Sequence, residues 1–162
     1  MARVLIVGCG CRGRELGKQL GELGWRVRGS SRSPAAIAAI EADGFESAQA
    51  DPDRPGTVLD LCADVAVVVW LLGSATGDKE AIAAIHGPRL ERLLEKLVDT
   101  PVRGFAYEVA GSVDPDLLGA GRRTAERAGE TWRIPIAFLT GDRGAPGWAI
   151  RSSEVVAGLV AG

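Results

Sequence analysis

Several residue types are scarce in this sequence, and each scarcity argues against a class of site. The 162 residues include three cysteines, one histidine, one tyrosine and three lysines. Cys9 and Cys11 form a C-x-C pair without a second pair, and Cys62 stands alone, so their spacing suits neither a zinc site nor a disulfide framework. We therefore expect no bound metal, and we interpret the cysteines as small buried residues beside a tight turn.

Long apolar runs and an excess of basic charge are also absent. The longest apolar run, VAVVVWLL at 65–72, is far shorter than the roughly twenty residues of a transmembrane helix. The formal net charge of −2 gives no electrostatic reason to expect nucleic acid or an acidic membrane surface as a partner. A strand-like segment begins at residue 3 and leaves no room for a signal peptide, so we expect a cytoplasmic protein.

What the sequence does contain is an alternation of apolar, β-branched runs with helical patterns. Such alternation requires parallel crossovers, with helices on both faces of a sheet. It predicts one α/β domain over 1–162, built as a doubly wound, Rossmann-like parallel sheet of about six strands. The predicted strands are RVLIV (3–7), WRVRGSS (25–31), FESAQ (45–49), DVAVVVWLL (64–72), VRGFAYEV (102–109) and WRIPIAFL (132–139).

Three helices and two edge loops can be placed in more detail. Ser33 before Pro34 is a typical N-cap for a helix through AAIAAIEA. The segment SSEVVAGLVAG (152–162) predicts a closing helix that starts at its serine pair. The loops DPDRPG (51–56) and TGDRGAPG (140–147) are expected at the carboxyl edge of the sheet, where open α/β sheets bind ligands. A further helix has one apolar face, formed by Leu90, Leu93, Leu94 and Leu97.

The stretch VGCGCRGREL (7–16) follows the first predicted strand and contains the pattern G-x-G-x-x-G. In such a strand–turn–helix unit, Gly8 permits the sharp turn, Gly10 lets the backbone approach a pyrophosphate, and Gly13 lets the helix pack on its strand. The free N–H groups of the helix N-terminus favour phosphate. Glycines at 17 and 21 extend the column and indicate an unusually close approach of the helix to the sheet or to a ligand.

The segment GSSRSP (29–34), after the second strand, indicates which dinucleotide would bind. NAD sites usually place Asp or Glu near this position, where the carboxylate binds the ribose hydroxyls. Here Ser31 offers a hydroxyl and Arg32 a guanidinium suited to a 2′-phosphate, while Arg12 could reach that phosphate or the pyrophosphate. The pattern favours NADP over NAD. The alternative is that Arg32 is merely a solvated arginine at a helix start.

These segments resemble the NAD(P)-binding domain of the atypical and extended short-chain dehydrogenase/reductase superfamily, which includes NAD-dependent epimerases and dehydratases. QADPD (49–53) is similar to the acidic segment after the third strand, where Asp51 would contact the adenine amino group. VVVWLLGSA (67–75) is similar to the fourth strand and its turn, with Ser74 also beside the cofactor. The resemblance and the glycine turn together imply a cofactor site formed by Gly8, Gly10, Cys11, Arg12, Gly13, Ser31, Arg32, Asp51, Leu71, Leu72 and Gly73.

The sequence departs from this family where its members carry out proton transfer. The family's Tyr-x-x-x-Lys motif is missing, because the only tyrosine, Tyr107, is followed four residues later by Gly111. Only TGDRGAPG stands where members insert a substrate-binding region. Glu108 and Ser112 are the remaining acid–base candidates, although Glu108 in an apolar strand is more simply explained by an ion pair with an arginine.

Two classes of function follow: a minimal NADP-dependent reductase or epimerase acting on an unidentified small molecule, or a non-catalytic dinucleotide-binding or redox-sensing module. A third is S-adenosylmethionine-dependent methyl transfer, because VLIVGCG (4–10) and SPAAIAAIEADG (33–44) also resemble the first motifs of class I methyltransferases. The acids that those enzymes carry within the first strand, near Ile6, and at the end of the second, where Ser31 stands, are missing, and their third glycine falls one residue earlier, at Arg12. His86 is expected to be a cap or a solvated residue, and Trp148 a core aromatic or the cover of a ligand. Self-association into a homodimer would cover apolar surface left by the missing substrate region.

Overall fold

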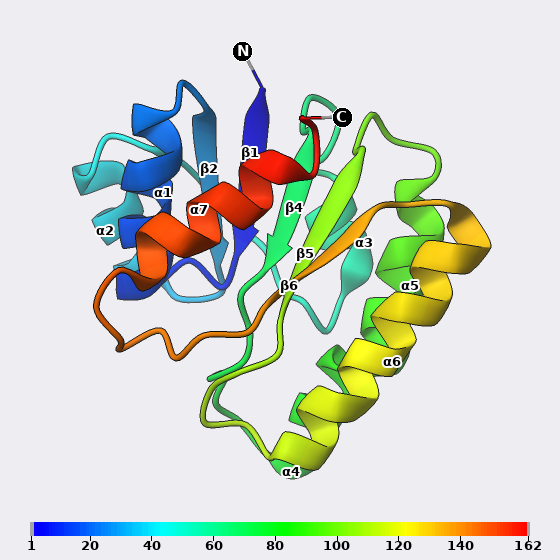
Figure 1. Cartoon of the computed structure of the whole chain (residues 1–162). Helices are drawn as coiled ribbons and strands as arrows, with labels where there is room; N and C mark the ends of the chain where they lie inside the picture. The colour runs from blue at the N-terminus through cyan, green and yellow to red at the C-terminus, as the bar shows by residue number, and fades with distance from the viewer. Residues whose placement is uncertain (1, 162) are drawn as a thin grey trace.

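Six segments of the chain form one all-parallel sheet in the computed structural model, which describes residues 2–161 (Figure 1). The strand order is β3-β2-β1-β4-β5-β6, so the chain runs outward from β1 in one direction and then from β4 in the other. The predicted doubly wound α/β domain is therefore confirmed. The strands are β1 (Arg3–Val7), β2 (Arg26–Ser31), β3 (Glu46–Gln49), β4 (Val67–Trp70), β5 (Gly104–Glu108) and β6 (Ile136–Leu139).

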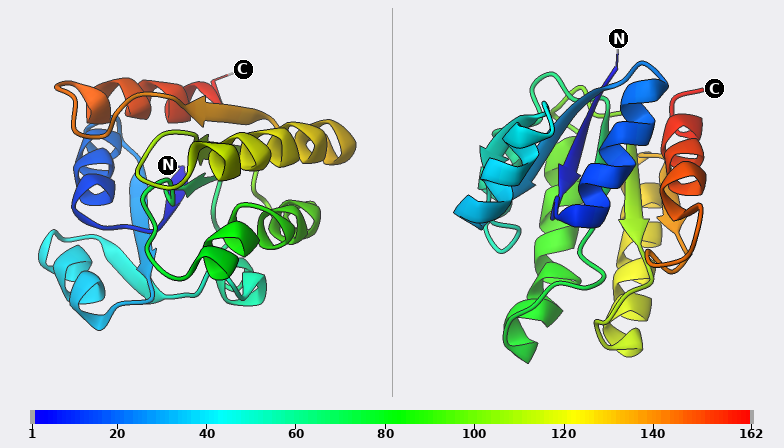
Figure 2. Two further views of the ribbon diagram at one scale, coloured as in Figure 1. Left: turned by 90° about the horizontal axis from the view of Figure 1, so that it is seen from below. Right: turned by 90° about the vertical axis from the view of Figure 1, so that its left-hand side faces the viewer.

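Helices cover both faces of the sheet, and α1 and α7 lie side by side on one of them (Figures 1 and 2). None of the helices among residues 2–161 is long and apolar enough to cross a membrane. The helices are α1 (Cys11–Glu22), α2 (Pro34–Ala42), α3 (Pro55–Leu59), α4 (Lys79–Ile85), α5 (Pro88–Leu97), α6 (Pro115–Trp132) and α7 (Trp148–Gly158).

Alternate residues of the strands build a separate core on each face, as the two-residue period of a strand requires. Along β1, Val4 and Ile6 pack toward α1, α2 and α7, whereas Leu5 and Val7 pack toward α3, α4, α5 and α6. The four leucines predicted on one face of α5 are all fully buried. Ser33 caps α2 as predicted, because its side chain accepts a hydrogen bond from the backbone N–H of Ala36.

The last two predicted segments are wrong in their boundaries. The closing helix begins at Trp148 rather than at Ser152, because Gly147 adopts a φ of 78° and turns the chain into the helix four residues earlier. Ser152 and Ser153 are buried inside α7, and Val155, predicted on its apolar side, is 39% exposed. The segment 132–139 is not all strand, since α6 continues to Trp132 and ends at a left-handed Arg133.

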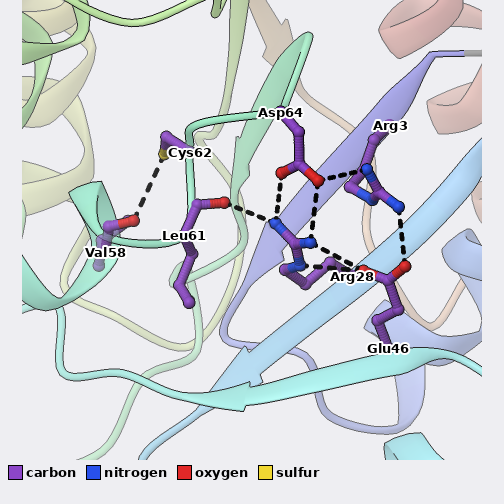
Figure 3. A network of polar contacts seen from close by, with 7 residues as sticks. All are labelled: Arg3, Arg28, Glu46, Val58, Leu61, Cys62 and Asp64. Carbon is purple, nitrogen blue, oxygen red and sulfur yellow. Dashed lines mark hydrogen bonds and ion pairs between the residues drawn. The ribbon is translucent and has the colours of Figure 1, made fainter.

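Charged side chains tie together the amino ends of the strands (Figure 3). Arg3 and Arg28 share the carboxylates of Glu46 and Asp64, with N···O distances of 2.8 Å for Arg3–Glu46 and for Arg28–Asp64. Arg28 also donates to the carbonyl oxygen of Leu61 at 2.8 Å. The hydrogen bond from Arg28 lowers the pKa of the Asp64 carboxyl below its ordinary value. The charges of Arg3 and Arg28 are therefore matched by carboxylates.

His86 fixes the end of α4 to the opposite, carboxyl edge of the sheet. Its Nε2 lies 3.0 Å from the carbonyl oxygen of Leu72, and its Nδ1 lies 2.6 Å from the hydroxyl oxygen of Tyr107. Because a carbonyl only accepts, Nε2 carries the proton and the tyrosine donates to Nδ1. We expected His86 to be either a helix cap or a solvated residue. It is the C-cap residue of α4, and it is not solvated, since it is only 1% exposed. Burial lowers the pKa of His86 and raises the pKa of Tyr107.

We predict that Gly121→Ala destabilises the protein by about 1–3 kcal/mol, because an added methyl group would overlap the buried hydroxyl of Tyr107. Gly119→Ala in the same helix is the matched control. Its methyl group would meet only the end of the Arg123 side chain, at 3.6 Å, and alanine favours the helix by up to about 1 kcal/mol. Urea unfolding of the two variants checks the prediction, and equal stability of both would contradict it.

A second prediction concerns pH. The folded state holds His86 neutral, so below the ordinary pKa of 6.5 the unfolded chain takes up a proton that the folded chain excludes. The free energy of unfolding should fall as the pH decreases from about 7 to about 5.5, with a slope of at most about 1.4 kcal/mol per pH unit. Asp64 titrates below its ordinary pKa of 3.8, outside this window.

Urea unfolding at several pH values measures that slope, with His86→Gln as the control. The variant should have a flatter profile between pH 7 and 5.5, and parallel profiles would contradict the prediction. Since His86 is the only histidine, its imidazole signals in an NMR titration are unambiguous and report the lowered pKa directly.

Candidate functional site

A cleft of about 460 Å³ opens at the carboxyl edge of the sheet, where the chain reverses direction between β1 and β4. This is the position at which open α/β sheets bind ligands. Its walls are the glycine turn, the end of β2, the segments after β3 and β4, and one side chain from the loop after β6. The lining residues are Val7, Gly8, Gly10, Ser30, Ser31, Arg32, Ser33, Ala50, Pro52, Leu71, Leu72, Ser74, Ala75, Thr76 and Arg143.

The glycine turn has the geometry that its sequence predicts. Gly8 has a φ of 81°, and a Cβ atom there would lie 2.6 Å from the carbonyl oxygen of Leu71. Gly10 faces open space, because no atom lies within 4 Å of where its Cβ would be. No side chain caps α1 at Gly10, so the first N–H groups of this helix have no side-chain partner. The cleft thus meets a helix N-terminus that a ligand can approach closely.

The other glycines of α1 divide into packing and exposed positions. Gly13 is buried, and a Cβ there would lie 3.1 Å from the sulfur of Cys9, which confirms its packing role. Gly17 packs equally closely on Val27 and Phe45. Gly21 is exposed with no neighbour within 4 Å, so the predicted column of close approach ends at Gly17.

The end of β2 supplies a buried hydroxyl and an exposed guanidinium. The Ser30 side chain borders the cleft and is 1% exposed, yet its Oγ has no hydrogen-bond partner. Ser31 Oγ accepts from the backbone N–H of Ser33 at 3.1 Å. Arg32 is exposed and points its Nη2 toward the carbonyl oxygen of Thr76, 3.5 Å away. An unpartnered buried hydroxyl in a binding cleft is the kind of group that a ligand satisfies.

Five of the predicted cofactor residues do not line the cleft: Cys11, Arg12, Gly13, Asp51 and Gly73. Asp51 lines an adjoining recess of about 90 Å³ together with Arg32, and its Oδ1 accepts from the backbone N–H of Asp53 at 2.9 Å. Arg12 forms an ion pair of 3.0 Å with Glu15 and lines a different cavity of about 290 Å³, which we call the side cavity. Cys11, the first residue of α1, is exposed. All three cysteines were expected to be buried. Cys9 and Cys62 are buried, and the expectation is wrong for Cys11.

Two close-packed segments continue from β4 and β5 past the sheet. The backbone N–H of Gly73 donates to Oε1 of Glu108 at 2.8 Å, and that of Ser112 donates to Oγ of Ser74 at 3.1 Å. Gly111, at a φ of 145°, lies directly against Gly73, where a side chain on either residue would collide with the other segment. Ser74 borders the cleft, whereas Gly73 and the exposed Ser112 do not line it.

Glu108 is wholly buried at the end of β5, and it is paired with Arg143. Arg143 donates from Nη2 to Oε1 at 2.6 Å and from Nε to Oε2 at 3.2 Å. The ion-pair interpretation of Glu108 is therefore confirmed. The sequence alone did not single out Arg143, although it predicted that the loop TGDRGAPG (140–147) lies at the carboxyl edge. Figure 1 shows this connection from β6 running along that edge toward α1.

Beside this pair, Trp148 begins α7 and is 3% exposed, and its Nε1 has no hydrogen-bond partner. It packs in the same core as α1 and lines the side cavity, so its expected place in the core is confirmed. No cluster of histidine, cysteine or carboxylate side chains within residues 2–161 could hold a metal ion.

No family model and no curated protein sequence matches the chain. Solved structures match it with TM-scores of 0.60 to 0.69. Triphenylmethane reductase from Citrobacter sp., solved with NADP(H), is 18% identical over 86% of this chain and 49% of its own, with a TM-score of 0.65. UDP-glucose 4-epimerase from Thermotoga maritima is 13% identical over 89% of this chain and 58% of its own, with a TM-score of 0.69.

An NADPH-dependent quinone oxidoreductase from Escherichia coli is 18% identical over 85% of this chain and 46% of its own, with a TM-score of 0.60. The chain thus spans about half the length of these structures. At such identities the likeness shows the fold, and it confirms the expected one, a Rossmann-like parallel sheet.

Proposed function

We propose that the chain binds NADP(H) in the cleft and is related in function to the reductases and epimerases that share its fold. One observation carries this proposal: the cleft passes over an uncapped helix N-terminus and is bordered by two arginines, Arg32 and Arg143, with no carboxylate among its lining residues. Such a surface favours a ligand with several phosphate groups. The neighbours include a reductase solved with NADP(H) and an NADPH-dependent oxidoreductase.

The residues present fit the dinucleotide at several points. The open backbone at Gly10 and the first turn of α1 would hold the pyrophosphate, with Cys11 and Gly13 contributing backbone N–H groups. The unpartnered Oγ of Ser30 and the hydroxyl of Ser31 would meet ribose hydroxyls, and Arg32 the 2′-phosphate. The adenosine would lie along Leu71 and Leu72, and Asp51 in the adjoining recess would meet the adenine amino group.

When bound, the nicotinamide supplies a donor or acceptor of hydride. The chain's own candidates for proton transfer are Glu108 and Ser112. Both oxygens of Glu108 already accept hydrogen bonds from Arg143 or Gly73, which supports a positioning role for this carboxylate. The chain is then either a minimal oxidoreductase, in which Ser112 or a group of the substrate moves the proton, or a non-catalytic dinucleotide-binding module.

A third prediction tests the cofactor. In calorimetric titrations the chain should bind NADPH at least about tenfold more tightly than NADH, because Arg32 contributes a charged hydrogen bond to the 2′-phosphate. Arg32→Glu should abolish this preference. Arg92→Glu is the control, since it makes the same charge change on the exposed face of α5.

Unchanged NADPH affinity in Arg32→Glu would contradict the assignment of that residue. Binding of neither nicotinamide dinucleotide would overturn the proposed function. A heat of binding from S-adenosylmethionine alone would favour the methyltransferase interpretation instead.

A fourth prediction separates an enzyme from a binding module. We expect oxidation of NADPH with at least one member of a panel of carbonyl compounds and sugar nucleotides, whereas its absence across the panel would favour the module. In Glu108→Gln we expect turnover and NADPH affinity to fall together, because the carboxylate positions Arg143 and Gly73. Turnover lost with unchanged NADPH affinity would assign proton transfer to Glu108, and thermal unfolding of the variant controls for misfolding.

A further inference from the structure

We propose that Arg143 binds the pyrophosphate of the dinucleotide, so that the loop 140–147 forms a second wall of the phosphate site. The first wall is the glycine turn with the start of α1, as described above. This inference rests on the proposed function and adds to it a binding residue from the opposite end of the chain.

The position of Arg143 is the first support. Its side chain borders the cleft together with Gly8 and Gly10, and it also borders the side cavity together with Arg12 and Glu15 from the first turns of α1. A residue that lines both surfaces lies next to the first turns of α1. The positive end of the helix dipole and the charge of Arg143 therefore act on the same region of the cleft.

The orientation of the guanidinium is the second support. Nε and Nη2 both face the carboxylate of Glu108, which uses one edge of the group. Among the hydrogen bonds of residues 2–161 none involves Nη1, although an arginine carries five N–H donors. The Arg143 side chain is 25% exposed, whereas its partner Glu108 is fully buried. Glu108 thus holds the group in place, while the opposite edge stays available to an anion.

A third support comes from the surroundings. Ser30 Oγ is buried and unpartnered on the same cleft, and the carbonyl oxygen of Ser30 accepts hydrogen bonds from the backbone N–H groups of Gly8 and Cys9. This unpartnered hydroxyl indicates that a polar group of a ligand can bind in the part of the cleft beside the glycine turn. Arg32, the other arginine of the cleft, stands at the end of β2 beside the adenine recess. The two arginines therefore suit two different phosphate groups of one ligand.

The test is a calorimetric titration with two probes, NADPH and adenosine 2′-monophosphate, which carries the 2′-phosphate but no pyrophosphate. Arg143→Gln should weaken NADPH binding about tenfold or more and change the binding of adenosine 2′-monophosphate by less than about twofold. Arg32→Gln should weaken both probes. Arg143→Lys should fall between wild type and Arg143→Gln for NADPH, because lysine keeps the charge but cannot reproduce the two-point contact with Glu108.

Arg92→Gln on α5 is the matched control, because it also replaces a surface arginine by glutamine. Thermal unfolding of each variant reports on its fold. Unchanged NADPH affinity in Arg143→Gln would overturn the inference while leaving the proposed function standing. Equal losses for both probes would also overturn it, since they would show a general collapse of the cleft. Failure of wild type to bind either probe would overturn the proposed function and this inference with it.

Discussion

The buried carboxylate of Glu108 is the constraint on which the carboxyl edge of this protein depends. A carboxylate that is removed from water is costly unless it is paired and hydrogen-bonded, so a positive partner has to reach it. The partner comes from the loop after β6, and a third hydrogen bond comes from the backbone of Gly73 after β4. One side chain on β5 thereby fixes the ends of three neighbouring strands relative to one another.

The two edges of the sheet have different electrostatic character as a result. At the amino edge, Arg3 and Arg28 are matched by two carboxylates, Glu46 and Asp64 (Figure 3). At the carboxyl edge the first N–H groups of α1 have no side-chain partner, and the cleft is lined by Arg32 and Arg143 with no carboxylate among its lining residues. The helix N-terminus and these arginines thus lie where the sheet topology opens a cleft, and in the proposed function the same region would receive an anionic ligand.

The sequence predicts features that depend on neighbouring residues far better than it predicts long-range contacts. The glycine turn, the capping of α2 by Ser33 and the buried leucines of α5 follow from local chemistry and periodicity, and all are present. The direction of Arg12 is an exception among the local features, because an ion pair with Glu15 one turn along the helix holds it where a contact with a phosphate was expected. The start of α7 was misplaced because a positive φ at Gly147 begins the helix before the serines that resemble a cap.

Arg143 shows most clearly why part of the site lies beyond sequence reasoning. Edge-loop composition places the segment 140–147 near the ligand, but nothing in its order of residues says that Arg143 reaches back thirty-five positions to Glu108. In the matched structures this chain spans only about half the length, and here β6 and α7 are joined by that short segment alone. The arginine of this connection is already anchored by Glu108. In the proposed function the residues at this edge would hold phosphate groups, and any substrate would have to approach from the open side of the cleft.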